Sequence, residues 1–349
     1  MNTRFIKPFC LHRGTARRFL FALPVALALL LCLAGGCQQY TSRPYAFLRG
    51  EALGTFYAIT VDLDTSKALL QAIDSTLDQI NARFSIYDSS SLICQFNLTQ
   101  EYIVDNEFAK LTSLALRVAA ASNGAFDPTV GPYARAWGFA QTDYAADDTL
   151  LLESMRDYVG YNHLRVAGDT IFKNHPKVEL SFNAIAKGYA SDCVLATLRR
   201  RGAANAMVEI GGEVALLGRN PHGQPWRIGI DAPVPGLAPG EKLLRTLADT
   251  AGGIATSGNY RNFHIEGKKH WGHTIDPRNG HPAQSTMRSA TILAPTCAEA
   301  DAWATACMVM PPEEAKATIA QQTDLKAFLV YQRSPIDTTL ITWNSKNLQ

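Results

Sequence analysis

The order of the predicted strands and helices is the feature that most constrains the fold of this chain. Segments rich in β-branched and aromatic residues predict several strands that follow one another without a helix between them. They cover 54–62, 163–166, 178–182, 206–217, 226–231, 288–293 and 325–331. A doubly wound protein alternates strands and helices, whereas runs of strands favour antiparallel or mixed pairing. The sequence therefore predicts the α+β class, with mixed or antiparallel sheets packed against helices.

Apolar residues recur at helical spacing in four segments. These predicted helices cover 69–84, 107–122, 186–201 and 297–310. The second of them stops at Asn123-Gly124, a pair that commonly ends helices. Thr296 and Glu299 form a Ser/Thr-x-x-Glu capping box, which predicts the start of the last helix.

The N-terminal segment differs from the rest of the chain. Five basic residues precede the uncharged apolar run 19–33, which is the pattern of a signal peptide. The run ends in small residues before Cys37, as in the bacterial lipobox, where the cysteine becomes the first residue and is acylated. About 15 apolar residues interrupted by Pro24 are short for a membrane span. The sequence thus predicts a lipoprotein signal peptide over 1–36, a lipid-anchored linker over 37–49 and one domain over 50–349.

Charge and cysteine content narrow the class of partner. Removal of the signal peptide leaves 28 basic against 31 acidic residues, a formal charge of −3, so nucleic acid is not expected as a partner. Cysteines remain beyond Cys37 at positions 94, 193, 297 and 307. In an exported chain they allow disulfides with three connectivities, although four thiols are the favoured alternative. None of these cysteines has the C-x-x-C spacing that is typical of zinc sites, so a zinc site is not expected.

Two segments have the composition of ligand-binding loops. Residues 123–138 combine glycines, prolines, aromatic residues and Asp127, which suits a flat ring or a ribose, although an ordinary loop with core aromatics has the same composition. Residues 181–192 run from a predicted strand into a helix that begins near Lys187-Gly188. Backbone N–H groups and an ammonium there would bind a phosphate, and a surface lysine in a first helical turn is the alternative.

Glycines and polar residues mark two further segments. Gly211-Gly212 lies inside a strand pattern and predicts a β-bulge, which either faces a ligand or is purely structural. Ser257, His273 and Asp276 raise the alternative of a Ser-His-Asp hydrolase, but the chain has no Gly-x-Ser-x-Gly elbow. His273 is better placed as a single general base or orienting group.

Asp301 and Thr305 lie four residues apart on the last predicted helix and therefore share a face. A carboxylate and a hydroxyl that point together into a cavity are oxygen ligands suited to Mg²⁺. The alternative is a solvated aspartate, but the Ala- and Trp-rich surroundings favour burial, and a buried carboxylate needs a partner.

Eight segments together, in order along nearly the whole mature chain, resemble the FAD:protein FMN transferase (ApbE-type) family. They are ALGTFYAI, FSIYDSSSLICQFN, NGAFDPTVGPYARAWGF, SFNAIAKGYASD, VEIGGEVALLG, TSGNYRN, HTIDPRNG and AEADAWAT. The resemblance implies an ApbE-like, T-fold-like architecture and Mg²⁺-dependent transfer of FMN from FAD to a Thr or Ser hydroxyl of a target protein, with release of AMP. A FAD pyrophosphatase giving FMN and AMP and a non-catalytic flavin-binding lipoprotein are the alternatives.

The resemblance also implies roles for individual residues. His273 would assist the acceptor hydroxyl, and Lys187 would stabilise phosphate oxygens. The implied FAD site consists of Leu53, Tyr87, Ala125, Phe126, Asp127, Ser181, Lys187 and Thr274. The implied metal ligands are the backbone of Ala184, the Asp301 carboxylate and the Thr305 hydroxyl.

Three positions depart from the family pattern. Leu53 stands where many members have Met. Ala184 stands where some members have Thr, and Ala304 where some have a second Asp, so the metal would have fewer side-chain ligands. The family's acceptors suggest respiratory flavin subunits as partners, which fits a lipoprotein exported to the periplasmic side of a bacterial membrane, with the inner membrane favoured.

Overall fold

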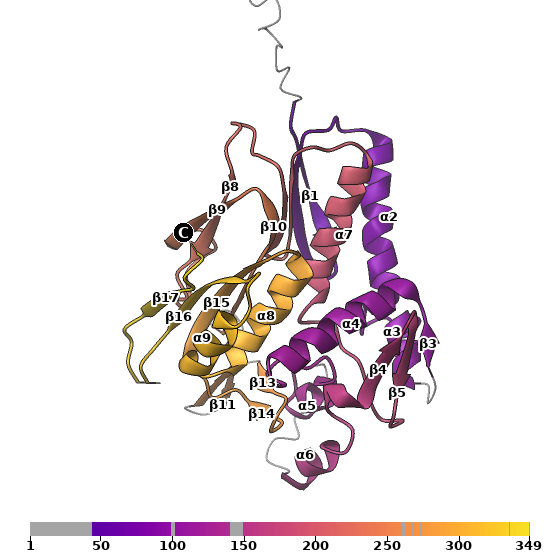
Figure 1. Ribbon diagram of the computed structural model, residues 1–349, viewed down its shortest axis with the longest axis vertical. Helices are drawn as coiled ribbons and strands as arrows, with labels where there is room; N and C mark the ends of the chain where they lie inside the picture. Colours follow the sequence, from indigo (N-terminus) through magenta and orange to yellow (C-terminus); the bar gives the residue numbers. More distant parts are fainter. Residues whose placement is uncertain are drawn as a thin grey trace, which may run out of the picture. The chain divides into compact units, whose positions relative to one another are not determined.

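An eight-stranded antiparallel sheet organises this protein (Figure 1). The computed structural model describes residues 44–98, 102–139, 149–259, 263–266, 269–272, 274–334 and 336–348. In spatial order the sheet contains β1 (Ala46–Ala52), β2 (Thr55–Val61), β6 (Ala206–Ile210), β7 (Glu213–Leu217), β10 (Ala251–Gly258), β15 (Met287–Ala294), β16 (Lys326–Tyr331) and β17 (Ile341–Asn344). Every neighbouring pair in this sheet is antiparallel. The predicted α+β class is confirmed.

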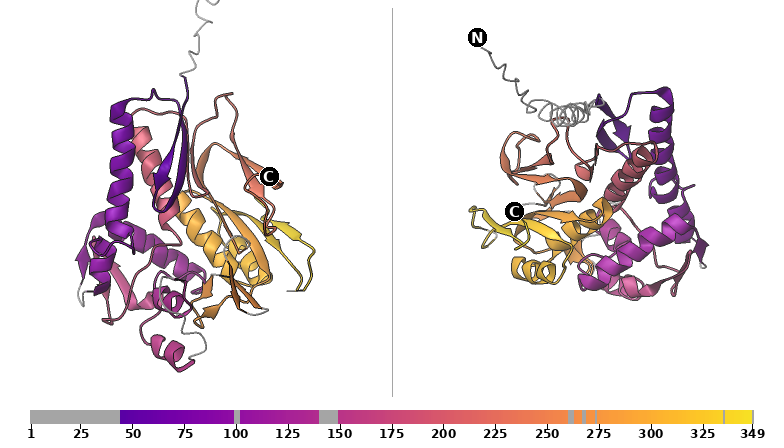
Figure 2. Two further views of the ribbon diagram at one scale, coloured as in Figure 1. Left: turned by 180° about the vertical axis from the view of Figure 1, so that it is seen from behind. Right: turned by 45° about the horizontal axis from the view of Figure 1, so that its top comes forward.

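Two helices, α7 (Ala186–Arg200) and α8 (Cys297–Val309), lie directly on one face of this sheet (Figures 1 and 2). Two more, α2 (Lys67–Phe84) and α4 (Asn106–Ala121), pack against α7 and α8 respectively. Helix α7 packs on β6 and β7, α8 packs on β10 and β15, and α2 packs beside α7. The core between helices and sheet consists of alternate strand residues such as Val208, Ala215, Ala255 and Ile292. All four predicted helices are confirmed, and Asn123 and Gly124 end α4 with positive φ.

A separate hairpin covers part of the other face. It consists of β8 (Trp226–Asp231) and β9 (Leu243–Asp249). Trp226, Ile230 and Leu247 of the hairpin pack against Val214 and Ile254 of the large sheet in a second apolar core. The Pro- and Gly-rich segment 232–240 lies in the loop between these two strands.

The remaining elements lie in the connections between strands of the large sheet. Between β2 and β6 lie α3 (Leu92–Leu98), β3 (Ile103–Val104), α5 (Gly131–Ala136), α6 (Thr149–Met155), η1 (Tyr161–His163), β4 (Leu164–Ala167) and β5 (Thr170–Lys173). Between β10 and β15 lie β11 (Phe263–Glu266), β12 (Lys269–Gly272), β13 (Ile275–Asp276) and β14 (His281–Pro282), and α9 (Pro312–Ala320) follows α8. Within the described ranges, no helix combines the length and the apolar character that a membrane span requires.

The predicted linker over 37–49 needs a correction at its C-terminal end. Residues from Ala46 onward belong to β1, which pairs with β2 along its whole length, from Ala46 opposite Val61 to Ala52 opposite Thr55. An apolar residue, Phe47, stands at an exposed outward position and Gly50 at an inward one, so the sequence of β1 carries little of the alternation that marks a strand. Pairing with β2 decides its structure.

The predicted single strand over 206–217 is a hairpin, so the predicted bulge is wrong. Ile210 pairs with Glu213, and Gly211 and Gly212 form the two-residue turn between β6 and β7. Their φ angles are 62° and 102°, the combination that a type I′ turn requires and that glycine adopts at little cost. Apolar residues continue on both sides of the turn, so the sequence pattern does not show where β6 ends and β7 begins.

The predicted strand over 178–182 is also wrong, because this extended segment pairs with no other strand in the described residues. A side chain takes the place of a neighbouring strand. The Asn97 amide donates to the Leu180 carbonyl at 2.9 Å, and Leu180 N–H donates to Asn97 Oδ1 at 2.8 Å. The residue pattern of a strand is present, but its hydrogen bonds go to a side chain.

Several connections meet at one end of the large sheet. Because Tyr57 pairs with Ile210, the Leu53-Gly54 turn between β1 and β2 lies near the Gly211-Gly212 turn. Strand β10 runs antiparallel to β7 and therefore ends, at Gly258, on the same side. The connection 259–286 leaves the sheet from this end. Segments distant in the sequence are thus brought together here.

Candidate functional site

The close contact between α7 and α8 builds the centre of the site. A Cβ on Gly188 would overlap the carbonyl of Cys297, and a Cβ on Gly253 of β10 would overlap the Cys297 backbone. The absence of side chains at these two positions lets α8 approach both elements. As a result Asp301 of α8 reaches the first turn of α7, where Gly188 N–H donates to Asp301 Oδ2 at 3.1 Å. The start of α7, where the helix dipole favours a negative charge, is therefore occupied by the Asp301 carboxylate.

Three charged side chains gather at this contact. Lys187 Nζ lies 3.4 Å from Glu213 Oε1 and 3.9 Å from Asp301 Oδ2. The side chains of Glu213 and Asp301 are 7% and 3% exposed, whereas that of Lys187 is 32% exposed. The Lys187 side chain is therefore partly exposed, whereas both carboxylate side chains are buried. We call these three residues the charged cluster.

Burial and charge act against each other in the charged cluster. Burial and the neighbouring Asp301 carboxylate raise the pKa of Glu213 to about 8, although Lys187 acts in the opposite direction. Burial alone would lower the pKa of Lys187, but Asp301 and Glu213 outweigh it and hold that pKa above its usual value. Lys187 is therefore a cation whose charge the protein uses to keep two carboxylates near each other.

Sequence reasoning missed Glu213, although one signal marks it. It is an acidic residue at the start of an otherwise apolar strand, directly after Gly211-Gly212. A charge in a strand buried on both faces needs a specific partner. That partner is Lys187, and only the packing of α7 against β7 brings the two residues together.

The predicted metal residues lie around the charged cluster. Asp301 and Thr305 are one turn apart on α8, and Thr305 Oγ1 lies 3.4 Å from Ser257 Oγ at the end of β10. Ala184 is half-buried and lies two residues before α7, whose first turn contacts Asp301. The fold thus brings this predicted set to the same ends of α7 and β10.

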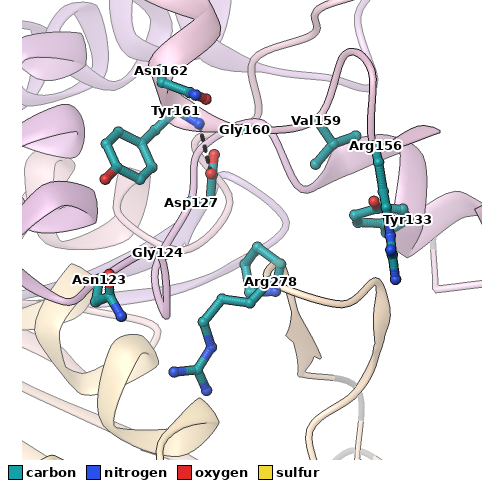
Figure 3. Close-up of a pocket in the computed structure, with 11 residues that line it drawn as sticks. Asn123, Gly124, Asp127, Tyr133, Arg156, Val159, Gly160, Tyr161, Asn162 and Arg278 are labelled. Atoms are coloured by element: carbon teal, nitrogen blue, oxygen red, sulfur yellow. Dashed lines mark hydrogen bonds between the residues drawn. The ribbon is translucent and has the colours of Figure 1, made fainter. Parts of the chain in front are cut away.

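A polar cavity of about 360 Å³ forms a second region (Figure 3). Asp127, Tyr161 and Arg278 are among its lining residues. Asp127 Oδ1 accepts hydrogen bonds from the N–H and hydroxyl of Thr129 at 2.8 and 2.6 Å, and Oδ2 accepts one from Tyr161 N–H at 2.7 Å. Burial raises the pKa of Asp127 in spite of these bonds. The carboxylate therefore holds the cavity wall together as well as facing the cavity.

The predicted FAD residues fall into separate places. Leu53 lies in the β1–β2 turn with a φ of 54°. Thr55, two residues further on, and Lys187 both lie beside Gly211, so this turn is near the charged cluster. Ser181 N–H donates to the Pro128 carbonyl at 2.8 Å, which ties residue 181 to the loop of Asp127. Thr274 donates to Asn259 Oδ1 at 3.0 Å in the connection that leaves β10.

Other predicted FAD residues point elsewhere. The side chains of Ala125 and Phe126 are buried in the main core, so contact with a ligand at these positions falls to the backbone. Tyr87 is 69% exposed, and its backbone N–H is bonded to Ser85. The described contacts of Tyr87 do not join it to the other predicted residues. The assignment of these residues to FAD stays a prediction.

His273 lies outside the described residues, so its predicted role and the Ser-His-Asp alternative stay predictions. The two possible partners of a triad are engaged with other groups. Ser257 faces Thr305, and the Asp276 carboxylate accepts from Arg278 Nε at 2.9 Å. Cys94, Cys193, Cys297 and Cys307 are unpaired thiols, so the alternative without disulfides is the one the structure has.

The fold and the site define an α+β protein whose charged groups gather where one end of an antiparallel sheet meets two helices. Residues 53–329 match the model of the ApbE family, so the chain belongs to this family. The FAD:protein FMN transferase of Vibrio cholerae serotype O1 is 34% identical over 316 residues, which cover 88% of this chain and 92% of that relative. The FAD:protein FMN transferase of Escherichia coli K12 is 31% identical over 311 residues, which cover 85% and 86%.

Solved structures agree with this assignment. Flavin transferase ApbE from Vibrio cholerae superposes with a TM-score of 0.76 at 31% identity, covering 87% of this chain and 97% of that one. The apo form of the Pseudomonas stutzeri flavinyl transferase ApbE superposes with a TM-score of 0.77 at 28% identity, covering 87% and 95%. The family resemblance of the eight sequence segments and the ApbE-like fold are confirmed.

Proposed function

We propose that this chain is a transferase that moves FMN from FAD to a hydroxyl group of a target protein. One observation carries the proposal. A chain that belongs to the ApbE family over residues 53–329 places a lysine ammonium and two buried carboxylates together at one end of its sheet. Phosphoryl-type transfer depends on positioning and charge stabilisation more than on covalent chemistry of the protein. The charged cluster has the groups for that task.

The proposed reaction transfers the FMN phosphoryl group from AMP to a Thr or Ser oxygen. The hydroxyl oxygen attacks the FMN phosphorus, the bond from that phosphorus to the AMP oxygen breaks, and AMP leaves with the electron pair. The hydroxyl proton passes to a general base. His273 is proposed for this role because of its place in the HTIDPRNG segment.

The residues of the site fit a divalent cation. Asp301 and Thr305 offer a carboxylate and a hydroxyl on one face of α8, and the Ala184 carbonyl precedes α7. Glu213 Oε2 is buried and has no hydrogen-bond partner in the described residues. Hard cations such as Mg²⁺ prefer oxygen donors of these kinds. When bound, Mg²⁺ supplies charge neutralisation on the phosphates of FAD.

Lys187 is proposed to hold the phosphate oxygens. Its ammonium is the positive charge of the cluster, and Lys187 follows the first residue of α7, where backbone N–H groups also favour anions. Contacts that strengthen as charge develops on the leaving phosphate speed the transfer. Asp301 and Glu213 keep Lys187 charged for this purpose.

The location of the enzyme is also a proposal. Residues 1–43 lie outside the described ranges, so the signal peptide and the lipid on Cys37 rest on the sequence pattern. We propose that this lipid tethers the transferase to the periplasmic side of the inner membrane. A respiratory flavin subunit facing the same compartment would then be within reach as the acceptor.

The function is tested with residues 38–349, FAD, Mg²⁺ and a candidate acceptor peptide that contains Thr. AMP release and peptide mass are followed with time. We expect AMP to appear together with a peptide that carries FMN in a phosphoester, and EDTA to abolish both products. A matched peptide with Ala in place of Thr should release no AMP.

Two results would overturn the transferase proposal. AMP and free FMN without modified peptide would identify a FAD pyrophosphatase. Tightly bound FAD with neither product, in the presence of Mg²⁺ and several acceptor peptides, would identify a flavin-binding protein.

A further inference from the structure

Glu213 is the one member of the charged cluster to which the family resemblance gives no role. Backbone and side chain together, Glu213 is 5% exposed. Oε1 lies 3.4 Å from Lys187 Nζ, and Oε2 is buried without a hydrogen-bond partner in the described part of the chain. Burying a carboxylate oxygen without a hydrogen-bond partner is unfavourable, so such an atom indicates a missing partner.

The backbone holds Glu213 firmly in this position. It is the first residue of β7 after the tight Gly211-Gly212 turn and pairs with Ile210. The Ser191 hydroxyl of α7 donates to the Glu213 carbonyl at 3.0 Å. The alternation of β7 places Val214 in the core under the β8–β9 hairpin, so Glu213 faces the helices. Its carboxylate is therefore aimed at Lys187 and Asp301.

The charges of the cluster do not balance when both carboxylates are ionised. One ammonium then faces two carboxylates, and the Lys187 side chain still reaches solvent. A buried carboxylate that lacks a counter-charge is unfavourable. A second positive charge would satisfy the buried Oε2 and release Lys187 toward an anionic substrate.

We propose that Glu213 is a second carboxylate of the divalent-cation site beside Asp301, and that Lys187 is the counter-ion which shares these carboxylates with the cation. The inference rests on the proposed function, since the cation is the one that the transferase would use. Glu213 would supply the second negative charge of this site from the sheet, while Asp301 supplies the first from α8.

Cation binding in the absence of FAD and acceptor tests this proposal. Mn²⁺ replaces Mg²⁺ as the probe, and free Mn²⁺ is titrated by electron paramagnetic resonance. We expect Glu213→Gln to weaken Mn²⁺ binding at least about tenfold, because a carboxylate charge is lost at a poorly solvated site. We expect Lys187→Met to strengthen Mn²⁺ binding, because the competing ammonium is removed.

Glu209→Gln is the matched control. Glu209 is a carboxylate on the neighbouring strand β6, and its side chain lies on the opposite face because Val208 and Ile210 face the helices. Its substitution should leave Mn²⁺ affinity unchanged. Equal Mn²⁺ affinity in Glu213→Gln and Glu209→Gln would overturn the proposal.

The second variant keeps the test decisive if Glu213→Gln does not fold. Unchanged or weaker Mn²⁺ binding in folded Lys187→Met, checked by thermal unfolding, would overturn the proposal by itself, and so would wild-type protein that binds no Mn²⁺. Because no flavin is present, a failure of FMN transfer in the wild type would count against the proposed function and leave this result intact.

Discussion

Helices α7 and α8 each contribute an aspartate that accepts hydrogen bonds at the start of the other helix, and the two contacts have different consequences. Asp192 of α7 binds the start of α8: its Oδ1 accepts from Cys297 N–H and its Oδ2 from Ala298 N–H, both at 2.9 Å. Asp301 of α8 binds the start of α7, where its Oδ2 accepts from Gly188 N–H at 3.1 Å. Each helix therefore provides an anion for the other helix's N-terminus.

The difference lies in what remains available on each carboxylate. Both oxygens of Asp192 are engaged by backbone N–H groups, which is a complete helix cap. The described hydrogen bonds of Asp301 engage Oδ2 alone, and Lys187 and Thr305 lie nearby. One aspartate therefore joins the two helices, while the other joins them and keeps an oxygen for chemistry. Four substitutions separate these two roles.

The largest effect is expected for Asp301→Asn. The amide can still accept from Gly188 N–H, so stability should change little, but loss of the charge should slow FMN transfer at least about 100-fold. AMP release measures the rate, and thermal unfolding measures stability. Near wild-type turnover of the folded variant would place Asp301 with Asp192 as a purely structural residue.

Gly188→Ala should impair the contact on which both aspartates depend. Its new methyl group would overlap the Cys297 carbonyl, so α7 and α8 must separate. We expect the free energy of unfolding to fall by about 3 kcal/mol, since overpacking at a close contact is costly. Urea unfolding measures this loss. A fully stable variant would show that the crossing of the two helices is not as tight as their glycines indicate.

Asp192→Ala should lower stability without a direct effect on the chemistry. It leaves two N–H groups of α8 without their acceptor, for a loss of about 2 kcal/mol. Urea unfolding and AMP release per folded molecule are the measurements. A large loss of turnover in fully folded Asp192→Ala would contradict the division between the two aspartates.

Thr296→Ala should have the smallest effect. Thr296 Oγ1 accepts from Glu299 N–H at 3.2 Å at the partly exposed start of α8. Because Asp192 continues to bind the two preceding N–H groups, we expect a loss of about 1 kcal/mol. Urea unfolding beside Asp192→Ala compares the local cap with the tertiary one. A Thr296→Ala loss greater than that of Asp192→Ala would reverse their ranking.

Local signals were sufficient for much of the fold. Helical spacing predicted α2, α4, α7 and α8 because each buries one stripe or most of its surface in the core. The capping box at Thr296 and the helix end at Asn123-Gly124 are contacts between residues a few positions apart. The same spacing placed Asp301 and Thr305 on one face of α8.

Errors arose where a distant partner decides the local structure. β1 depends on pairing with β2, and residues 178–182 satisfy their backbone through Asn97 rather than another strand. The hairpin at Gly211-Gly212 continues an apolar pattern across a turn, because β6 and β7 are both buried. Periodicity within a segment carries no information on any of these partners.

By itself the sequence determined the helices, most of the strands, the α+β class and the membership of the ApbE family, since these depend on local spacing and on the order of motifs. Only the tertiary structure decided that Glu213 lies beside Lys187 and Asp301. It also decided that Asp192 of α7 binds the start of α8 and that Asp301 of α8 binds the start of α7. The physical reason is that these contacts follow from strand order and from the close crossing of two helices at Gly188. Packing of the whole chain sets both.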